Sequence, residues 1–333
     1  MTPLASARRF LLPLAPGYRL GLALRELRLR TGIEPVRRLR WPVVSVGSLS
    51  AGGSGKTPLT IALAQALARR GLQVDVLSRG YGRTSSLAGR VDPGGAAENY
   101  GDEPLLIAQA AGVPVYVAAE RYEAGLLAER SAPSASGLHL LDDGFQHRQL
   151  ARNVDILLLD ARDWFTETLL PAGNLREPLS ALRRASVLAI PAHDAPQLEP
   201  SLRSRGGWQG PVWRLHRRME VPAVDGPVAA FCGIARPAQF FLGLEAAGLQ
   251  VAVKTAFPDH HRYTPRDIGR IVSVARAAQA KTLVTTEKDR VRIGQIALPL
   301  PLEAARLRIE IENEPAALDW LEDRLAKVSA PGS

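Results

Sequence analysis

The sequence predicts an α/β protein in which a mostly parallel, P-loop-containing sheet is flanked by helices and followed by a second, smaller α/β domain. Three observations support this. Apolar, β-rich runs alternate with helical patterns, as is typical of parallel sheets. A glycine-rich segment joins the first of these runs to the clearest helix. A polar region at 193–225, which contains proline and tryptophan, interrupts the alternation before it resumes.

Six apolar runs in the first part of the chain are expected to be strands. They are Pro42–Gly47, Val74–Ser78, Val113–Ala118, Leu138–Leu141, Val154–Asp160 and Val187–Pro191. The clearest helix covers Pro58–Arg70, where apolar residues recur at helical spacing. Proline in its first turn and Gly71 after its last arginine are typical start and stop signals.

The alternation resumes after the polar region, which places a domain boundary near 210–226. The strands expected there are Val228–Ile234, Gln250–Thr255 and Lys281–Thr286, with a helix over Pro237–Ala247. Thr264, followed by Pro265 and Asp267, is a typical helix start. We therefore expect an N-terminal segment at 1–40, a P-loop-containing domain at 41–215 and a smaller α/β domain at 226–330.

Composition narrows the class of protein. The chain has 333 residues, of which 46% are hydrophobic and 23% are charged, and this excludes a disordered chain. A single cysteine, Cys232, excludes a disulfide framework and is expected to be a small buried side chain. Residues 1–40 hold nine arginines and two glutamates, which is +7 of the net +9. The remainder is nearly neutral, so nucleic acid is not an indicated partner.

The N-terminal segment has a distinct pattern. Leucines and arginines are mixed between Pro16 and Thr31, which predicts a basic helix with a leucine-rich side. Such a helix can lie on an anionic membrane surface. A helix that packs on its own domain with a solvated arginine face is the alternative. No apolar run reaches the length of a transmembrane helix, roughly 18–20 residues.

The glycine-rich segment, Gly47–Thr57, follows a strand and opens a helix, which is the context of a P-loop. Lys56 can reach the β- and γ-phosphates of a nucleotide, and the Thr57 hydroxyl can bind Mg²⁺. Ser50 stands where the usual pattern has glycine, and the glycines after it supply the flexibility. Ala51 replaces the signature lysine of membrane-associated partitioning ATPases. The residues expected to bind the nucleotide are Ser50, Ala51, Gly52, Gly53, Ser54, Gly55, Lys56 and Thr57.

Acidic residues follow other predicted strands and open a helix. The strand at 138–141 leads into Asp142 and Asp143, which resembles a Walker B strand with Mg²⁺ ligands at the carboxyl edge of the sheet. Asp102 and Glu103 head a helical pattern, where they could act on substrate or merely offset the helix dipole. Asp160 is a weaker metal candidate.

Two further clusters lie in the second domain. A histidine in Asp259–His261 could pair with a carboxylate and support a general base, or it could lie in a surface loop. The segment Thr286–Asp289 ends a strand at the carboxyl edge, and a solvated loop is the alternative interpretation there.

Together these motifs resemble the tetraacyldisaccharide 4′-kinase family, the lipid A 4′-kinases of Gram-negative bacteria. Any one of them apart from the P-loop is weak, but they occur in order over most of the chain. The matching stretches are Val46–Pro58, Ser78–Arg83, Gly101–Pro104, Leu141–Gln149, Pro171–Pro178, Phe257–Tyr263 and Thr286–Asp289.

The resemblance implies an ATP- and Mg²⁺-dependent kinase that phosphorylates the 4′-hydroxyl of tetraacyldisaccharide 1-phosphate to give lipid IV(A). It implies that the domain at 41–215 is the kinase domain and that the smaller domain at 226–330 closes over the site. It implies a peripheral protein on the cytoplasmic face of the inner membrane, whose partners are the anionic acylated disaccharide and the membrane surface, with no protein partner indicated. It also implies residue roles: Asp102 as general base supported by His261, Lys56 as the phosphate-neutralising lysine, Thr57, Asp142 and Asp143 on the magnesium side, and Arg79, Tyr81, Arg176 and Glu177 as substrate residues.

Two other functions use the same features. A membrane-recruited nucleotide switch would also need a P-loop and a basic helix, although Thr286–Asp289 is only a partial match to a guanine-binding signature. A soluble P-loop kinase or ligase for a small metabolite would need only the P-loop. Deletion of residues 1–30 should leave the activity of an enzyme with a soluble substrate intact.

Overall fold

The computed structural model describes residues 9–133 and 136–329. Its strands are β1 (Val43–Ser48), β2 (Val74–Ser78), β3 (Gly89–Arg90), β4 (Val115–Val117), β5 (Leu138–Asp142), β6 (Val154–Leu158), β7 (Val187–Pro191), β8 (Val212–Glu220), β9 (Val228–Cys232), β10 (Val251–Ala256), β11 (Thr282–Thr286) and β12 (Leu302–Ile311). They form one sheet in the order β10-β9-β11-β12-β8-β7-β6-β1-β5-β2-β4-β3. The predicted mostly parallel α/β fold is confirmed.

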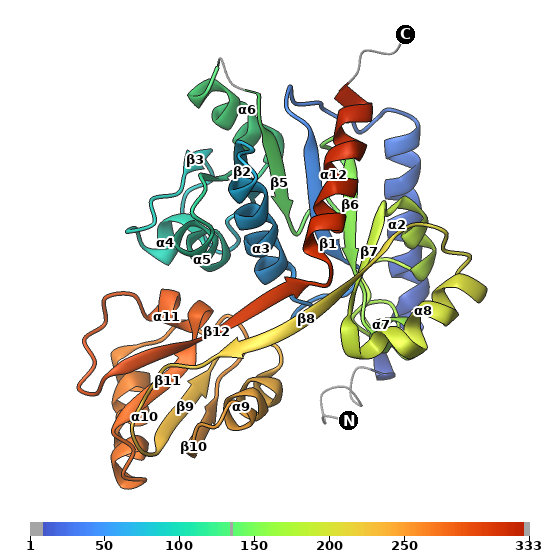
Figure 1. The fold of residues 1–333 in the computed structure, drawn as a ribbon. Coiled ribbons are helices and arrows are strands. Elements are labelled where there is room, and N and C mark those ends of the chain that lie inside the picture. Colours follow the sequence, from blue (N-terminus) through green and yellow to red (C-terminus); the bar gives the residue numbers. More distant parts are fainter. Residues whose placement is uncertain (1–8, 134–135, 330–333) are drawn as a thin grey trace.

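The sheet runs through two units, a larger and a smaller one (Figure 1). In the larger unit the strands from β8 to β4 are parallel, and only the short edge strand β3 is antiparallel. Every residue of β1 is buried, because helices cover both faces of the sheet. Val44 and Val46 join the core on the α3 side, whereas Val43 packs into the core on the opposite face. This alternation follows the period of two along a strand.

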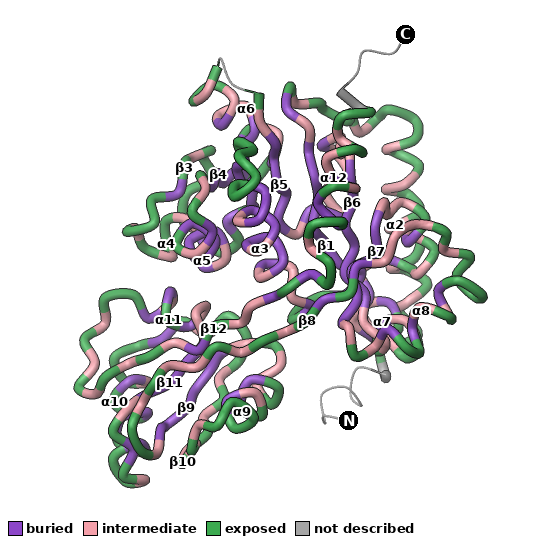
Figure 2. Tube along the Cα trace, viewed as in Figure 1, coloured by how far each residue is buried: buried purple, intermediate pink, exposed green. Residues whose placement is uncertain are grey.

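The helices of the larger unit include two that matter for the site, α3 and α5. The full set is η1 (Arg9–Leu14), α2 (Ala15–Arg30), α3 (Lys56–Arg69), α4 (Ala97–Tyr100), α5 (Asp102–Ala111), α6 (Arg121–Ser131), α7 (Ala161–Phe165), η2 (Leu179–Arg184), η3 (Ala192–Asp194), α8 (Ala195–Ser204) and α12 (Glu314–Ser329). Figure 2 shows the buried strands at the centre and the partly exposed α2 at the rim. Within the described residues no helix is long and apolar enough to cross a membrane.

The smaller unit is a parallel four-stranded sheet, β10-β9-β11-β12. Its helices are α9 (Pro237–Ala246), α10 (Pro265–Ala277) and α11 (Glu287–Ile293). Ala229 and Phe231 of β9 pack on the α10 side, while Val228, Ala230 and Cys232 pack on the α9 side. Cys232 is buried, as predicted.

The helix start expected at Thr264 is confirmed as a capping box. The Thr264 Oγ1 accepts from the Asp267 amide at 3.2 Å, and the Asp267 carboxylate accepts from the Thr264 amide at 2.9 Å. Two helix-terminal N–H groups that would otherwise lack partners are thereby satisfied.

Two long strands connect the units. The first half of β8 pairs with β7 in the larger unit, and the first half of β12 pairs with β11 in the smaller unit. Between these points β8 and β12 pair antiparallel, from Arg306 opposite Glu220 to Ile311 opposite Leu215. The chain therefore enters the smaller unit along β8 and leaves it along β12.

Helix α12 returns to the larger unit, although the sequence analysis assigned its residues to the smaller one. Leu318 and Leu321 are buried in the core that contains α3. Arg70, just after α3, pairs with Asp319 and Glu322 of α12 at 2.6 and 2.9 Å. The smaller unit thus ends with β12. Of the N-terminal segment 1–40, residues 1–8 lie outside the described residues.

Candidate functional site

The loop between β1 and α3 has the backbone expected of a P-loop. Gly55 caps α3 with φ of 94°, a left-handed conformation that favours glycine. The Ala51 amide donates to the Asn174 carbonyl at 2.8 Å, and the Ser50 Oγ donates to Asp163 at 2.7 Å. The Ser50 side chain therefore anchors the loop, and only its backbone is left to face a phosphate.

Lys56 lies at the start of α3 with its amine directed back into the loop. Its Nζ lies 3.2 Å from Ser48 Oγ, 3.3 Å from Ser54 Oγ and 3.6 Å from the Asp143 carboxylate. Burial lowers the pKa of Lys56, and the charge of Asp143 opposes this shift. A phosphate that entered the loop would supply the further negative charge that this buried amine lacks.

The two acids after β5 have different environments. Asp143 accepts from both terminal nitrogens of Arg176, at 2.8 and 2.9 Å. Although burial acts to raise it, the charge of Lys56 and the Arg176 hydrogen bonds lower the pKa of Asp143 to about 2. Asp142 accepts from Thr60 Oγ1, at 3.1 Å. Burial and the charges of Glu103 and Asp143 raise the pKa of Asp142.

The residues here fit a magnesium ion. Asp142, Asp143 and the buried Thr57 offer hard oxygen donors, and a divalent cation would favour the ionised form of Asp142. No group of three or more acidic, histidine or cysteine side chains forms a metal site in the described part of the chain. Mg²⁺ does not need one, because it is usually bound through one or two carboxylates, substrate phosphates and water.

The four predicted substrate residues divide into three groups. Arg176 lies on the phosphate side through its pair with Asp143. Arg79 and Tyr81 are exposed after β2, and the Tyr81 ring lies edge-on to the His260 ring, with 5.9 Å between centroids. Glu177 is buried and pairs with Arg184 at 2.5 Å. Its contacts indicate a role in holding this loop in place.

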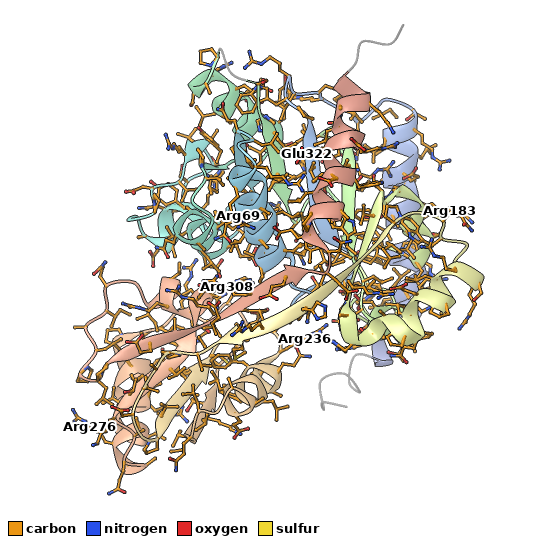
Figure 3. The ribbon with its side chains drawn as sticks, in the orientation of Figure 1. Arg69, Arg183, Arg236, Arg276, Arg308 and Glu322 are labelled. Atoms are coloured by element: carbon orange, nitrogen blue, oxygen red, sulfur yellow. The ribbon has the colours of Figure 1, made fainter. Side chains whose placement is uncertain are left out.

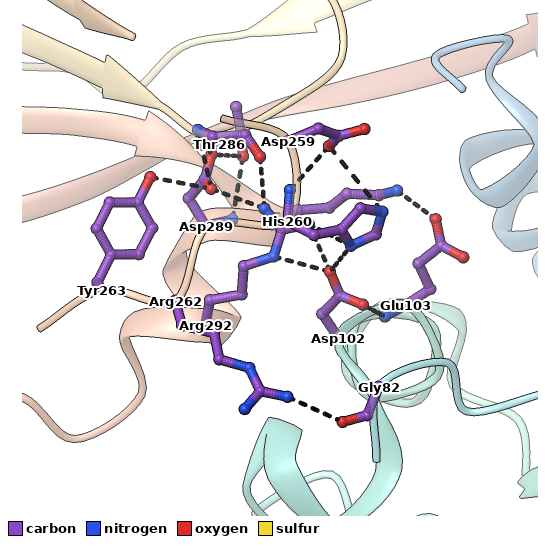
Figure 4. Close-up of polar contacts among 12 residues, drawn as sticks. Gly82, Asp102, Glu103, Asp259, His260, Arg262, Tyr263, Thr286, Asp289 and Arg292 are labelled. Carbon is purple, nitrogen blue, oxygen red and sulfur yellow. Dashed lines mark hydrogen bonds and ion pairs between the residues drawn. The ribbon is translucent and has the colours of Figure 1, made fainter. Parts of the chain in front are cut away.

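Asp102, in the first turn of α5, lies where the two units meet (Figure 4). Its Oδ2 accepts from Arg292 Nε and Nη2 at 2.8 and 2.5 Å, and it lies 3.1 Å from His260 Nδ1. Its Oδ1 accepts from the Glu103 amide at 3.0 Å. Burial acts to raise the pKa of Asp102, but the His260 hydrogen bond and the charge of Arg292 outweigh it, and the pKa lies well below its usual value.

The structure brings His260, and not His261, to Asp102, so the pairing expected for His261 is wrong. His261 stacks on Phe257, with ring centroids 4.6 Å apart, and pairs with Asp267 at 3.2 Å. Adjacent side chains point in different directions, and the left-handed backbone of His260, φ 58°, turns its ring to the larger unit. Asp143 also has a positive φ, 47°. Such conformations cost about 1–2 kcal/mol and cluster at functional sites.

The segment Thr286–Asp289 opens helix α11, so the solvated-loop interpretation does not hold. Thr286 caps the helix, and Lys288 pairs with Glu103 of the larger unit at 2.5 Å. Asp289 is fully buried and accepts from the Tyr263 hydroxyl, the Thr286 hydroxyl and the Gly233 amide. Glu103 lies between the group around Lys56 and Asp142 and the group around Asp102. Its charge acts on both Lys56 and Asp142.

The sequence analysis missed several arginines at this edge of the sheet. Arg121, at the start of α6, is buried near the charges of Arg79, Asp143 and Asp142, and burial lowers its pKa to about 10. Arg217 of β8 donates to the Ser54 carbonyl at 2.7 Å.

Two further arginines come from the smaller unit. Arg236 (Figure 3) lies against Gly53 and pairs with Asp160 at 3.4 Å, so Asp160 serves an ion pair here. Arg292 is the other. The sequence could have indicated Arg292 as a site residue only through its spacing of four from Lys288, which places both residues on one side of a helix.

The chain is similar to known proteins of one family. The model of the tetraacyldisaccharide-1-P 4′-kinase family matches residues 7–326. A tetraacyldisaccharide 4′-kinase of Koribacter versatilis is 43% identical over 323 residues, covering 92% of this chain and 96% of the relative. One from Anaeromyxobacter dehalogenans is 40% identical over 339 residues, covering 93% and 87%.

A solved structure is also similar. It is the crystal structure of LpxK from Aquifex aeolicus in complex with ATP, with a TM-score of 0.76 and 31% sequence identity. The similarity covers 96% of this chain and 99% of that chain.

Proposed function

The chain belongs to the tetraacyldisaccharide-1-P 4′-kinase family, and we propose that it transfers the γ-phosphoryl group of ATP, with Mg²⁺, to the 4′-hydroxyl of tetraacyldisaccharide 1-phosphate, giving lipid IV(A) and ADP. The position of the Asp102 carboxylate is the observation on which this proposal rests. This carboxylate heads α5, which packs against the P-loop helix α3, and its Oδ1 accepts from the Glu103 amide.

The proposed step is an in-line displacement. The bond between the 4′-oxygen and the γ-phosphorus forms while the bond from that phosphorus to the β,γ-bridging oxygen breaks, and ADP leaves with the electron pair. The hydroxyl proton passes to Asp102. A loose transition state demands positioning and charge neutralisation more than a strong base, so an ionised Asp102 with a low pKa is suited to it.

The remaining predicted residues have roles that fit their positions. Lys56 neutralises charge on the β- and γ-phosphates, and the loop amides from Gly52 to Thr57 surround them, while the Ala51 amide is held by the Asn174 carbonyl. When bound at Thr57, Asp142 and Asp143, Mg²⁺ supplies charge neutralisation on the phosphate oxygens. Tyr81 lies beside the His260 ring, and the charge of the exposed Arg79 suits an anionic sugar phosphate.

The test is transfer of ³²P from γ-labelled ATP to tetraacyldisaccharide 1-phosphate in detergent micelles. We expect lipid labelling by the wild type and none by Lys56→Ala. Hydrolysis of ATP without lipid labelling, with a verified substrate, would contradict the proposal and return the nucleotide switch and the small-metabolite kinase to consideration. A GTP affinity equal to that for ATP would favour the switch.

We also propose that the protein is peripheral on the cytoplasmic face of the inner membrane and contacts the bilayer through α2. One side of α2 holds the site loops: Tyr18 donates to the Arg176 carbonyl at 2.8 Å, and Arg25 donates to the Gln146 carbonyl. The other side exposes Leu20, Leu24 and Leu27, each by more than half. Their spacing makes one apolar stripe among arginines, which suits an anionic membrane surface.

Vesicle sedimentation tests this contact. We expect the double variant Leu20→Asp/Leu24→Asp to bind vesicles of mixed neutral and anionic phospholipid several-fold more weakly than the wild type. Leu87→Asp is the matched control, because Leu87 is 77% exposed in the connection between β2 and β3. Equal binding by the double variant would exclude α2 as the contact.

A further inference from the structure

We propose that Arg292 is a positioning residue for Asp102: the smaller unit uses it to hold the Asp102 carboxylate ionised and turned so that one oxygen faces the substrate hydroxyl. This inference rests on the proposed function. Arg292 belongs to α11, 190 residues along the chain from Asp102, and its side chain is only 6% exposed. It reaches the carboxylate across the boundary between the units.

The hydrogen bonds around Asp102 distinguish its two oxygens. Oδ2 receives three contacts, two from Arg292 and one from His260. Oδ1 receives one, from the Glu103 amide. A carboxylate oxygen has two lone-pair directions, so Oδ2 is fully used and Oδ1 keeps one direction open. The substrate hydroxyl is therefore expected to approach Oδ1.

Arg292 is itself held in place by other residues of the smaller unit. Its Nη1 donates to the Gly233 carbonyl at 2.6 Å and to the Asp289 carboxylate at 3.0 Å. Asp289 is in turn buried and held by the hydroxyls of Tyr263 and Thr286. All of these groups belong to the smaller unit, so the guanidinium is presented in one orientation before it meets Asp102 (Figure 4). A planar, permanently charged fork suits this task.

The charges that face Asp102 are few. His260 comes from the loop before α10, and Lys288 and Arg292 come from α11. Glu103 and Asp259 are the nearby acids, and Lys288 pairs with Glu103. Arg292 is thus the permanent cation in direct contact with Asp102, and its removal should raise the pKa of the carboxyl.

The experiment compares Arg292→Met, Arg292→Lys and the control Arg290→Met in the lipid kinase assay from acid to neutral pH. For Arg292→Met we expect kcat to fall about 10²-fold, an unchanged KM for ATP, and an acid limb of kcat/KM displaced upward by about one pH unit or more. Arg292→Lys should recover much of the loss. Arg290 is exposed on the same helix, and its side chain donates to the Gly294 carbonyl, so Arg290→Met should match the wild type.

Two results would overturn the proposal: an equal loss for Arg292→Met at every pH, or an Arg292→Lys variant as impaired as Arg292→Met. A thermal-unfolding cycle of Asp102→Asn, Arg292→Met and the double variant needs no lipid. We expect a double-variant loss in Tm smaller than the sum of the single losses, and additive losses would refute a direct pairing. If the wild type fails to label the lipid, the proposed function fails while this cycle still decides the pairing.

Discussion

The phosphate half and the hydroxyl half of the site are built differently. Lys56 and Thr57 open α3 after the loop that follows β1, and Asp142 ends the neighbouring strand β5, so a single sheet edge fixes the phosphate half. The hydroxyl half joins Asp102 to His260 and Arg292, which are 158 and 190 positions away in the sequence and belong to the smaller unit. The first half depends on local backbone and the second on how two units meet. Variants should therefore separate the two halves.

The largest effect is expected in the phosphate half. Lys56→Ala removes the cation that faces the β- and γ-phosphates, and we expect kcat for lipid phosphorylation to fall about 10³-fold or more. Lys254→Ala is the control, because Lys254 pairs only with Glu245 on the far sheet edge of the smaller unit. A rate near that of the wild type for Lys56→Ala would remove the basis for a P-loop mechanism.

In the hydroxyl half, Asp102→Asn should lower kcat by about 10²–10⁴-fold while ATP binding is retained, because the proton acceptor is lost and the P-loop is not touched. Single-turnover kinetics and nucleotide titration measure the two quantities. Asp225→Asn, at an exposed position in the connection between β8 and β9, is the matched control. A loss confined to KM would instead assign Asp102 to binding.

The two adjacent histidines sharpen the comparison within the hydroxyl half. His260→Ala should lower kcat by about 10–10²-fold, since the pair with Asp102 is lost. His261→Ala removes a ring stacked on Phe257. It should therefore lower Tm more than His260→Ala does, and lower kcat less than His260→Ala does. The assignment of His260 would be wrong if the two variants exchanged these behaviours in rate and melting measurements.

The smallest effect is on stability. The hydrogen bond to Asp102 raises the pKa of His260, so this pair stabilises the fold below the ordinary histidine value of about 6.5 and the contribution is lost as pH rises through the folded value. Because His260 is 42% exposed, we expect a Tm difference from His260→Gln of about 1 °C at pH 6. That difference should shrink by pH 8.5; a difference that grows with pH would contradict this linkage.

Sequence patterns predicted the elements whose side chains are buried on both faces. All six apolar runs of the larger unit are strands, because parallel strands covered by helices are apolar throughout. The strands β8 and β12 were missed. Their exposed arginines and glutamates alternate with apolar residues, and β8 lies in the polar region that marks the boundary.

The site shows the same division. The motif around Lys56 predicted a loop that the structure contains, because the glycines and the following helix determine it locally. The choice between His260 and His261 depends on a backbone angle at His260 that the sequence does not reveal. Arg292 has no motif of its own, and only the meeting of the two units brings it to Asp102.

The antiparallel pairing of β8 with β12 also makes the smaller unit a removable insert. The chain leaves the larger unit near Glu220 and re-enters it opposite, near Arg306. A two-residue hairpin turn between these positions would reconnect the sheet without altering the order of its other strands. A nucleotide-binding unit without the insert would keep Lys56 and Asp102 but would lose His260 and Arg292, which hold the Asp102 carboxylate.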